Sequence, residues 1–202
     1  VDRFREAGLH CLGPTKTASK LEGSKGFAKE FMQRFNIPTG RYQIFSDLAD
    51  AKEYVRTQGT PIVIKADGWA AGKGVVGALS ADQAMLAIEQ IMSEGRVGEA
   101  GQTVVIEEFL EGEEASFICI CDGKTAIPFA SSQDHKARDE GDLGPNTGGM
   151  GAYSPAPVVT PEIHRAVMTK IIKPTIDGMA AEGAPFVGFL YTGLMIDSLG
   201  QA

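Results

Sequence analysis

A glycine-rich segment that directly follows an apolar run does most to limit what this chain can fold into. Residues 61–65 (PIVIK) are apolar and β-branched and end in Lys65, which is typical of a buried strand. The glycines between Asp67 and Gly74 let backbone N–H groups approach a ligand closely. Because Lys65 and Lys73 bracket these donors, the segment favours binding of a polyphosphate. An ordinary hairpin with a glycine turn is the alternative.

A second segment, residues 104–114 (VVIEEFLEGEE), passes from a β-branched strand into acids around Phe109 and Leu110. Such a transition can supply the apolar walls, the backbone donor and acceptor, and the carboxylate that an adenine nucleotide needs. A solvated acidic turn is the alternative. Adjacent side chains on an extended chain point apart, so at most one of Glu113 and Glu114 faces a site.

A third feature is a long polar stretch without any regular period. It contains residues 131–136 (SSQDHK) and 144–151 (GPNTGGMG), and it is typical of a loop that wraps a polar ligand. A lone histidine such as His135 is more often structural than catalytic, and no second histidine lies at metal-binding spacing, so the sequence does not support a zinc site. Cys119 and Cys121 fall in an apolar strand and no G-x-S-x-G motif is present, so we expect neither a cysteine nor a serine nucleophile.

The spacing of apolar residues predicts an α+β protein with antiparallel sheets. Helices at 47–58 and 80–93, with the strands around them, are expected to form a small β–α–β–β–α–β unit. Other helices are expected from Thr17 to Phe35 and from about 160 to 182, the latter with an interruption at Pro174. Further strands are expected at 9–12, 41–45, 61–65, 75–79, 102–109, 115–121, 125–129 and 189–197.

Composition and charge exclude several function classes. Among the 202 residues, 19 basic and 26 acidic ones give a formal net charge of −7, which disfavours binding to nucleic acid. No apolar run approaches the roughly 20 residues of a membrane helix, and no secretory signal opens the chain. The cysteines number three, and this odd count is typical of reduced thiols in a cytoplasmic protein.

The two ends of the chain favour a fragment of a longer protein. The chain starts at Val1 with what reads as the last turns of a helix that stops at Gly8. It ends, after a strand, on a hairpin turn at 198–201. Unpaired strand edges are costly to leave exposed, so we expect partner strands outside these residues.

Five motifs together resemble the phosphoribosylamine–glycine ligases, also called glycinamide ribonucleotide synthetases, which are ATP-grasp enzymes of purine biosynthesis. The motifs are LEGSKxF (21–27), PIVIKADGxAAGKGV (61–75), VIEEFLxGEEASF (105–117), SQDHK (132–136) and GPNTGGMGAYSPAP (144–157). The resemblance implies an ATP-grasp fold, in which two antiparallel-sheet subdomains with helices hold ATP between them. It divides the chain into the end of an N-terminal α/β domain (1–14), the ATP-grasp core (15–42 and 109–202) and a small lid subdomain (43–108).

The resemblance also implies a reaction, in which ATP, glycine and 5-phosphoribosylamine give glycinamide ribonucleotide, ADP and phosphate by way of glycyl phosphate. Lys25 and Lys65 are the implied catalytic contacts to the ATP phosphates, although residue reasoning alone reads Lys25 as a solvated helix lysine. The other implied ATP-binding residues are Gly68, Gly72, Lys73 and Gly74 of the lid, Glu107, Glu108 and Leu110 at adenine, and Glu114 at the ribose. The implied substrate-binding residues are Asp134, His135, Lys136, Asn146, Thr147, Gly148, Gly149, Met150 and Gly151.

Some features depart from the family pattern. The magnesium (or manganese) ligands of the family lie on a Glu-x-Asn strand that follows the hairpin turn, so we expect them just past Ala202 and expect no metal ligand in this chain. The family's N-terminal domain should precede Val1. Ala137 and Trp69 stand where many members carry Arg and Leu. Phosphoryl transfer relies on metal, so we expect these residues to bind ATP with little or no turnover.

Two alternatives remain at this point. The first is an ATP-binding module without turnover, and the second is another ATP-grasp carboxylate–amine ligase. The 144–157 segment argues against the second. For the parent protein we expect a cytoplasmic monomer that binds glycine and 5-phosphoribosylamine, and neither nucleic acid nor membranes.

Overall fold

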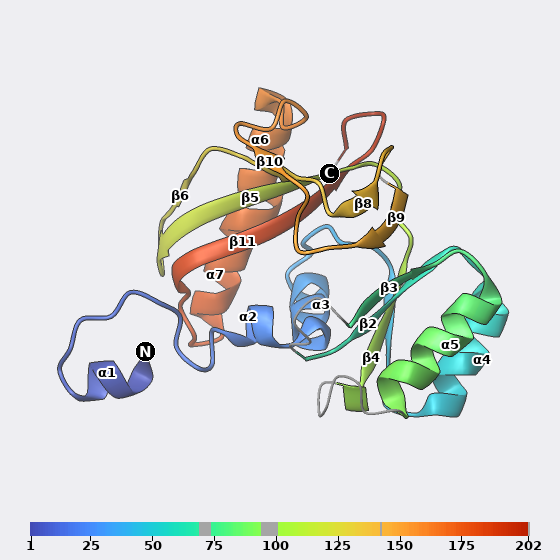
Figure 1. Ribbon diagram of the computed structural model, residues 1–202. Helices are drawn as coiled ribbons and strands as arrows, with labels where there is room; N and C mark the ends of the chain where they lie inside the picture. The colour runs from blue at the N-terminus through green and yellow to red at the C-terminus, as the bar shows by residue number, and fades with distance from the viewer. Residues whose placement is uncertain (69–73, 94–100, 142, 202) are drawn as a thin grey trace. The chain divides into compact units, whose positions relative to one another are not determined.

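The computed structural model describes residues 1–68, 74–93, 101–141 and 143–201 (Figure 1). Contacts divide the chain into two compact units. Unit 1 comprises residues 1–19, 34–38 and 111–202, and unit 2 comprises residues 20–33 and 39–110. Each unit combines helices with antiparallel strands, so the predicted α+β class is confirmed. None of the described helices is long and apolar enough to cross a lipid bilayer.

Unit 2 contains a four-stranded sheet in the order β1-β4-β2-β3, and every neighbouring pair is antiparallel. The strands are β1 (Tyr42–Phe45), β2 (Ile62–Ala66), β3 (Val75–Ala78) and β4 (Val104–Glu108). Figure 1 shows α4 (Leu48–Gln58) and α5 (Ala81–Met92) side by side against this sheet. The chain order β1-α4-β2-β3-α5-β4 confirms the predicted β–α–β–β–α–β unit.

The core of unit 2 lies between that sheet and the two helices. Ile62, Ile64 and Ala66 of β2 are buried there, while the intervening Val63 and Lys65 lie on the opposite face. Both helices begin where the sequence predicts. The Asp47 carboxylate accepts hydrogen bonds from the first N–H groups of α4, and the Ser80 hydroxyl accepts one from the Gln83 N–H.

The helix predicted from Thr17 to Phe35 is wrong as a single element. Two helices, α2 (Lys20–Gly23) and α3 (Lys25–Arg34), meet at Ser24. The Ser24 hydroxyl donates to the Asp67 carboxylate and accepts a hydrogen bond of 3.1 Å from the Phe27 N–H. These bonds start a new helix at Ser24, because they satisfy groups that a continuous helix would use internally.

Unit 1 is built on the long antiparallel pair β5 (Glu113–Asp122) and β11 (Val187–Ile196), extended by β6 (Ala126–Pro128) after the predicted hairpin at 122–123. Behind this sheet in Figure 1 runs one rod made of α6 (Pro161–Val167), the π-helical η2 (Met168–Ile172) and α7 (Lys173–Ala181). The predicted interruption of the α-helix next to Pro174 is confirmed, although the chain stays helical there. It takes the form of a wider π turn just before the proline, because proline lacks the N–H that a regular ladder needs.

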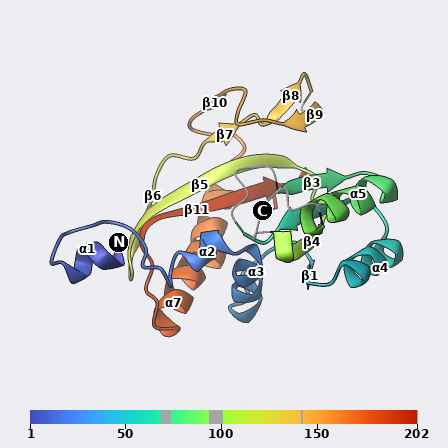
Figure 2. The same cartoon turned by 60° about the horizontal axis from the view of Figure 1, so that its bottom comes forward.

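Four short strands fill the region for which the sequence predicted no period. They pair as β7 (Gln133–Asp134) with β10 (Ala152–Tyr153), and β8 (Ala137–Asp139) with β9 (Leu143–Asn146). Figure 2 shows them on the side of β5 and β11 opposite α7. At the start of the chain, α1 (Asp2–Glu6) ends before Gly8 as predicted, but the strand predicted at 9–12 is wrong. Leu9 and Leu12 are exposed there, and a short strand is not stable without a partner.

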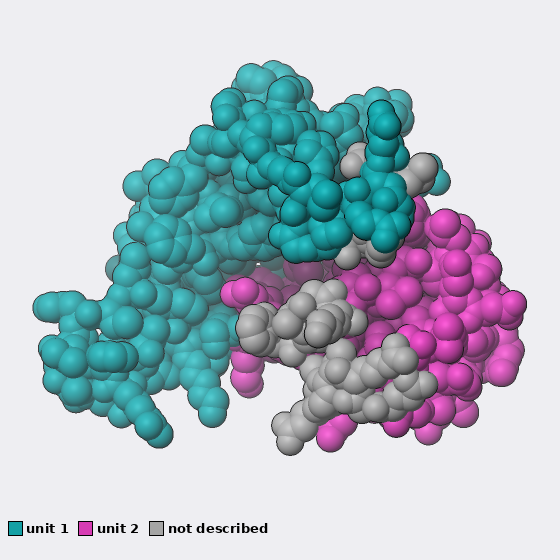
Figure 3. Space-filling view, in the orientation of Figure 1, with its two compact units in different colours: residues 1–19, 34–38, 111–202 teal, residues 20–33, 39–110 magenta. Residues whose placement is uncertain are grey.

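The two units are coloured separately in Figure 3. The small lid subdomain proposed at 43–108 falls within unit 2, which also includes residues 20–33. These added residues belong to unit 2 because α3 is tied to β2 and β4 by hydrogen bonds and ion pairs. The functional meaning of the division stays a prediction.

Candidate functional site

Strands β2 and β4 bring Lys65 and Glu107 together on one face of the sheet. In the register of this pair Val63 lies opposite Glu107, so Lys65, two residues further along β2, is its diagonal neighbour. The Lys65 ammonium lies 2.9 Å from Glu107 Oε1. This face is the one turned away from the core, because the buried residues of β2 alternate with Lys65. The strand pairing therefore positions both predicted residues without help from any loop.

A third residue, Lys29 of α3, completes this cluster. Its ammonium lies 2.8 Å from Glu107 Oε2, so the two lysines hold opposite oxygens of one carboxylate. Lys29 also donates to Thr39 Oγ1 at 2.7 Å and to the Gly40 carbonyl at 3.4 Å. Glu107 is 8% exposed and Lys29 is 7% exposed. Burial lowers the pKa of Lys29, while the charge and hydrogen bond of Glu107 oppose this shift.

Sequence reasoning missed Lys29, although one signal could have found it. Lys25 and Lys29 are four residues apart on a predicted helix, so both lie on one helix face. Lysine is seldom fully buried unless it is paired, and its partner here comes from a distant strand.

Lys25 begins α3 and reaches the end of β2. Its ammonium donates to the carbonyls of Ala66, at 2.8 Å, and Gly68, at 3.1 Å. In return, the Asp67 carboxylate accepts from the Gly26 N–H at 2.6 Å. Burial lowers the pKa of Lys25, and the nearby Asp67 carboxylate opposes that shift. The start of α3 and the start of the glycine-rich segment are thus fastened to each other.

The structure describes part of the predicted glycine-rich lid. The Gly68 carbonyl accepts from Lys25, and the Gly74 carbonyl accepts from the Ala66 N–H at 2.7 Å. Gly72 and Lys73 lie outside the described residues.

The predicted adenine-reading residues follow at the end of β4. The Glu108 carboxylate accepts from the Arg41 backbone N–H at 2.7 Å and from Arg41 Nε at 3.0 Å. These bonds, the backbone one first, lower the pKa of Glu108. The Glu108 side chain is therefore engaged within unit 2, while Phe109 and Leu110 beside it expose apolar side chains. The role of this turn in a nucleotide pocket stays a prediction.

In unit 1, the predicted ribose residue Glu114 pairs with the predicted substrate residue Lys136. Burial alone would lower the pKa of Lys136, but the hydrogen bond and charge of Glu114, with Tyr191 and Asp134, raise it above its ordinary value. The neighbouring Glu113 accepts from Gln133 Nε2 at 3.3 Å. Adjacent Glu113 and Glu114 thus have different partners, as the alternation of an extended chain requires.

Backbone hydrogen bonds bring the remaining predicted substrate residues together. His135 donates its N–H to the Gly151 carbonyl at 2.9 Å and accepts from the Met150 N–H at 2.7 Å. The Thr147 N–H donates to the Lys136 carbonyl at 2.7 Å, and Thr147 Oγ1 accepts from the Gly149 N–H. Asp134 pairs with Ala152, and Asn146 pairs with Ala137. The segments 134–136 and 146–151, the latter including Gly148, therefore form one folded-back structure.

The described residues offer no obvious metal or thiol chemistry. They contain no group of three or more His, Cys, Asp or Glu side chains that could hold a metal ion. Ala202, past which the resemblance implies the metal ligands, lies outside the described residues, so their position stays a prediction. Cys119 and Cys121 are buried free thiols, and burial raises the pKa of each to about 11. The thiolate, not the thiol, is the reactive form, so both are structural residues.

The chain is similar in sequence to known proteins. A family model described as "Phosphoribosylglycinamide synthetase, ATP-grasp (A) domain" matches residues 23–202. The chain is 60% identical over 200 residues to the phosphoribosylamine–glycine ligase of Xanthomonas axonopodis pv. citri, a match that covers 99% of this chain and 46% of that protein. The chain thus spans about half the length of the curated relatives it matches.

Solved structures confirm the fold predicted from the motifs. The crystal structure of phosphoribosylamine–glycine ligase from Thermotoga maritima matches with a TM-score of 0.84 and 34% identity, covering 93% of this chain and 47% of that one. Biotin carboxylase from Campylobacter jejuni matches with a TM-score of 0.76 and 18% identity, covering 100% of this chain and 43% of that one. The second likeness concerns the fold alone.

Proposed function

Because the chain belongs to the phosphoribosylglycinamide synthetase family, whose ATP-grasp (A) domain it matches, we propose that the protein carrying it is an ATP-dependent carbon–nitrogen ligase. The enzyme joins glycine to 5-phosphoribosylamine in purine biosynthesis, and it releases glycinamide ribonucleotide, ADP and phosphate. A glycine carboxylate oxygen attacks the γ-phosphorus of ATP and ADP leaves. The amine nitrogen then attacks the acyl carbon of glycyl phosphate and phosphate leaves.

The observation that supports this proposal best is the surplus of positive charge where α3, β2 and β4 meet. Among the described residues, three ammonium groups, from Lys25, Lys29 and Lys65, lie near the carboxylates of Asp67, Glu107 and Glu108, and the Arg41 guanidinium pairs with Glu108. Four positive charges thus face three negative ones. Positive charge and fixed N–H donors are what catalysis of phosphoryl transfer needs at the phosphates.

The resemblance to the family gives each predicted residue a role. Lys65 and Lys25 serve the phosphates, and Gly68 and Gly74, with the expected Gly72 and Lys73, cover them. Glu107 and the backbone of Glu108 and Leu110 read adenine, and Glu114 holds the ribose. The residues that bind glycine and phosphoribosylamine are Asp134, His135, Lys136, Asn146, Thr147, Gly148, Gly149, Met150 and Gly151.

Magnesium does not fit the described residues of this chain, because they hold no acidic cluster that could bind it. The free thiols are typical of a cytoplasmic protein, and the net charge of −7 disfavours nucleic-acid partners. We further propose that the protein works as a monomer on small-molecule substrates.

The proposal is tested in the whole protein by measuring ADP release. Glycine plus 5-phosphoribosylamine is expected to trigger release, and bicarbonate is not. Release with bicarbonate would identify another ATP-grasp ligase, and ATP binding without release under any condition would identify a module without turnover.

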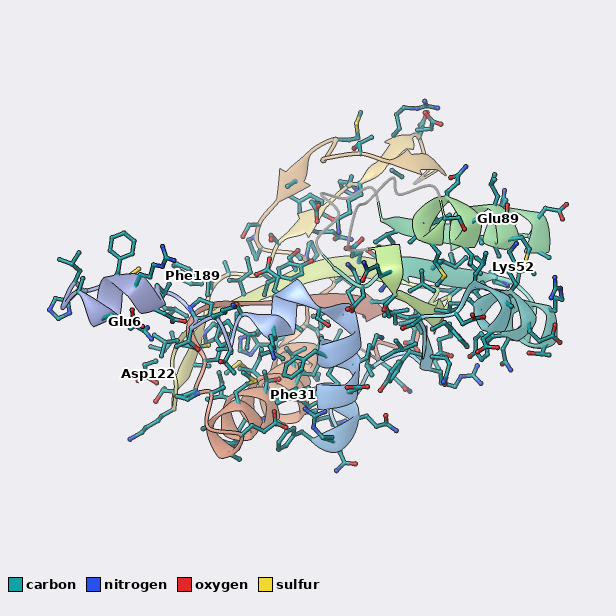
Figure 4. The ribbon with its side chains drawn as sticks, turned by 90° about the horizontal axis from the view of Figure 1, so that it is seen from below. Glu6, Phe31, Lys52, Glu89, Asp122 and Phe189 are labelled. Atoms are coloured by element: carbon teal, nitrogen blue, oxygen red, sulfur yellow. The ribbon has the colours of Figure 1, made fainter. Side chains whose placement is uncertain are left out.

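Calorimetry on Lys65→Ala tests the phosphate role. Loss of one charge-assisted hydrogen bond is expected to weaken ATP binding by about 1.5–3 kcal/mol. Lys52→Ala is the matched control, because Lys52 pairs with Glu89 between α4 and α5, as Figure 4 shows. Equal ATP affinity of the Lys65 variant and the wild type would remove Lys65 from the site.

A further inference from the structure

We propose that Lys29 is a positioning residue, which holds the Glu107 carboxylate in place so that Glu107 selects a purine with an amino group at position 6. This inference rests on the proposed function, since it concerns the nucleotide of that reaction. Its basis is the unequal way in which two lysines hold one carboxylate.

The two lysines that hold Glu107 are anchored differently. Lys29 has oxygen partners on three residues, namely Glu107, Thr39 and Gly40, and its side chain is 9% exposed. Its ammonium also lies 5.7 Å from the centre of the Tyr42 ring. The Lys65 side chain is 28% exposed. Lys29 is thus fixed within unit 2, whereas Lys65 has access to solvent and to an anionic ligand.

This asymmetry matters when a triphosphate binds. If Lys65 turns from Glu107 to a phosphate oxygen, Glu107 Oε1 loses its partner and Oε2 keeps Lys29. A buried carboxylate without a counter-charge is unfavourable, and without a fixed partner its orientation is no longer set. Lys29 supplies the counter-charge that remains after Lys65 has moved.

The orientation of the Glu107 carboxylate then decides what it can recognise, because a carboxylate only accepts hydrogen bonds. The 6-amino group of adenine donates, and the 6-oxo group of hypoxanthine or guanine accepts. A Glu107 carboxylate that Lys29 holds in place therefore favours adenine and repels a 6-oxopurine, and one that can turn away loses this distinction.

The test compares binding of ATP with that of inosine triphosphate, which carries an oxo group in place of the 6-amino group. Affinities are measured by calorimetry in the whole protein for the wild type, Lys29→Met and Lys65→Met. The preference for ATP is expected to fall about tenfold in Lys29→Met, the scale of one charge-assisted hydrogen bond. Lys65→Met is expected to weaken both nucleotides alike and to keep the preference, because Lys29 still holds Glu107.

Three further variants separate positioning from general damage. Lys52→Met removes the same charge from an ion pair elsewhere in unit 2 and is expected to leave the preference unchanged. Lys29→Arg keeps the cation and is expected to restore most of the preference lost in Lys29→Met. Thr39→Val removes only the hydroxyl that orients Lys29 and is expected to lower the preference by a smaller factor.

The outcomes can be told apart. A wild-type protein that binds neither nucleotide overturns the proposed function itself. ATP binding with an unchanged preference in a folded Lys29→Met protein overturns only the role of Lys29. If Lys29→Met does not fold, Thr39→Val decides, and a preference equal to that of the wild type overturns the inference.

Discussion

Glu107 and Glu114 stand in one acidic stretch of the sequence and both pair with lysine, yet they belong to different kinds of site. Glu107 lies on a sheet, where two lysines hold its oxygens and its side chain is 9% exposed. Glu114 pairs with Lys136 at the edge of an irregular region, and these side chains are 36% and 33% exposed. The contribution of a carboxylate to the free energy of unfolding therefore depends more on its position in the fold than on its neighbours in the sequence.

The difference follows from what surrounds each pair. The partners of Glu107 come from α3, which hydrogen bonds tie to the end of β2, and from β2, whose alternate residues lie in the core of unit 2. The partner of Glu114 comes from a segment held by backbone hydrogen bonds between short strands. Buried charges lose much when one partner is removed, whereas water replaces the partner of an exposed charge. Three substitutions test this contrast.

The largest effect is expected for Glu107→Gln, which leaves Lys29 and Lys65 without their shared counter-charge. Removing one partner from a buried ion cluster should lower the free energy of unfolding by about 3 kcal/mol or more. Urea denaturation at neutral pH measures it. Glu89→Gln is the control, since the Glu89 side chain is 48% exposed and its loss should cost below about 1 kcal/mol. Similar costs for both variants would contradict the contrast.

A smaller effect is expected for Asp67→Ala, which shows how far the buried network extends. The Asp67 carboxylate accepts from the Gly26 N–H and the Ser24 hydroxyl, so its removal should cost about 2 kcal/mol in unfolding free energy. Asp47→Ala removes an exposed cap of α4 and should cost about 1 kcal/mol. Hydrogen exchange should also speed up at Gly26. If the Asp67 variant is as stable as the Asp47 variant, the contacts of Asp67 do not belong to the buried network.

The smallest effect is expected for Glu114→Gln, which should cost less than about 1 kcal/mol in unfolding free energy. Its clearer signature is the pKa of Lys136, which should fall because burial then acts with less opposition. The contribution of the pair to stability is complete below the ordinary lysine pKa of 10.5 and is lost as pH rises through the raised value. Nuclear magnetic resonance titration of the Lys136 amino group measures the change. Glu113→Gln should leave that pKa unchanged, and a fall as large as that of Glu114→Gln would refute the assignment of the pair.

Sequence analysis predicted those helix starts and strands that residues close together in the chain determine. Ser80 and Gln83 mark the start of α5 because cap and helix are contiguous, and the run at 61–65 marks β2 because burial on one sheet requires such residues. Lys65 followed from its place at the end of that strand. The five motifs, of which those at 132–136 and 144–157 are the most particular, pointed to the family, and so to the fold, that the comparisons support.

What the sequence did not predict depends on distant partners. The helix break at Ser24 is made by Asp67, which is 43 residues away along the chain. Lys29 is buried because it pairs with Glu107, which lies on β4. Nothing near Ser24 carries that information, and the spacing of Lys25 and Lys29 indicates only a shared helix face, because helical spacing fits an unbroken helix with a solvated lysine equally well.

The buried thiols of β5 give the molecule an intrinsic reporter. In the native state, Cys119 and Cys121 are shielded from a thiol reagent, while Cys11 at the start of the chain is partly exposed. Within these 202 residues, a maleimide dye should therefore attach to one position in the native state and to three after denaturation. The rate at which the second and third labels appear measures how often unit 1 opens from its native state, and no engineered cysteine is needed.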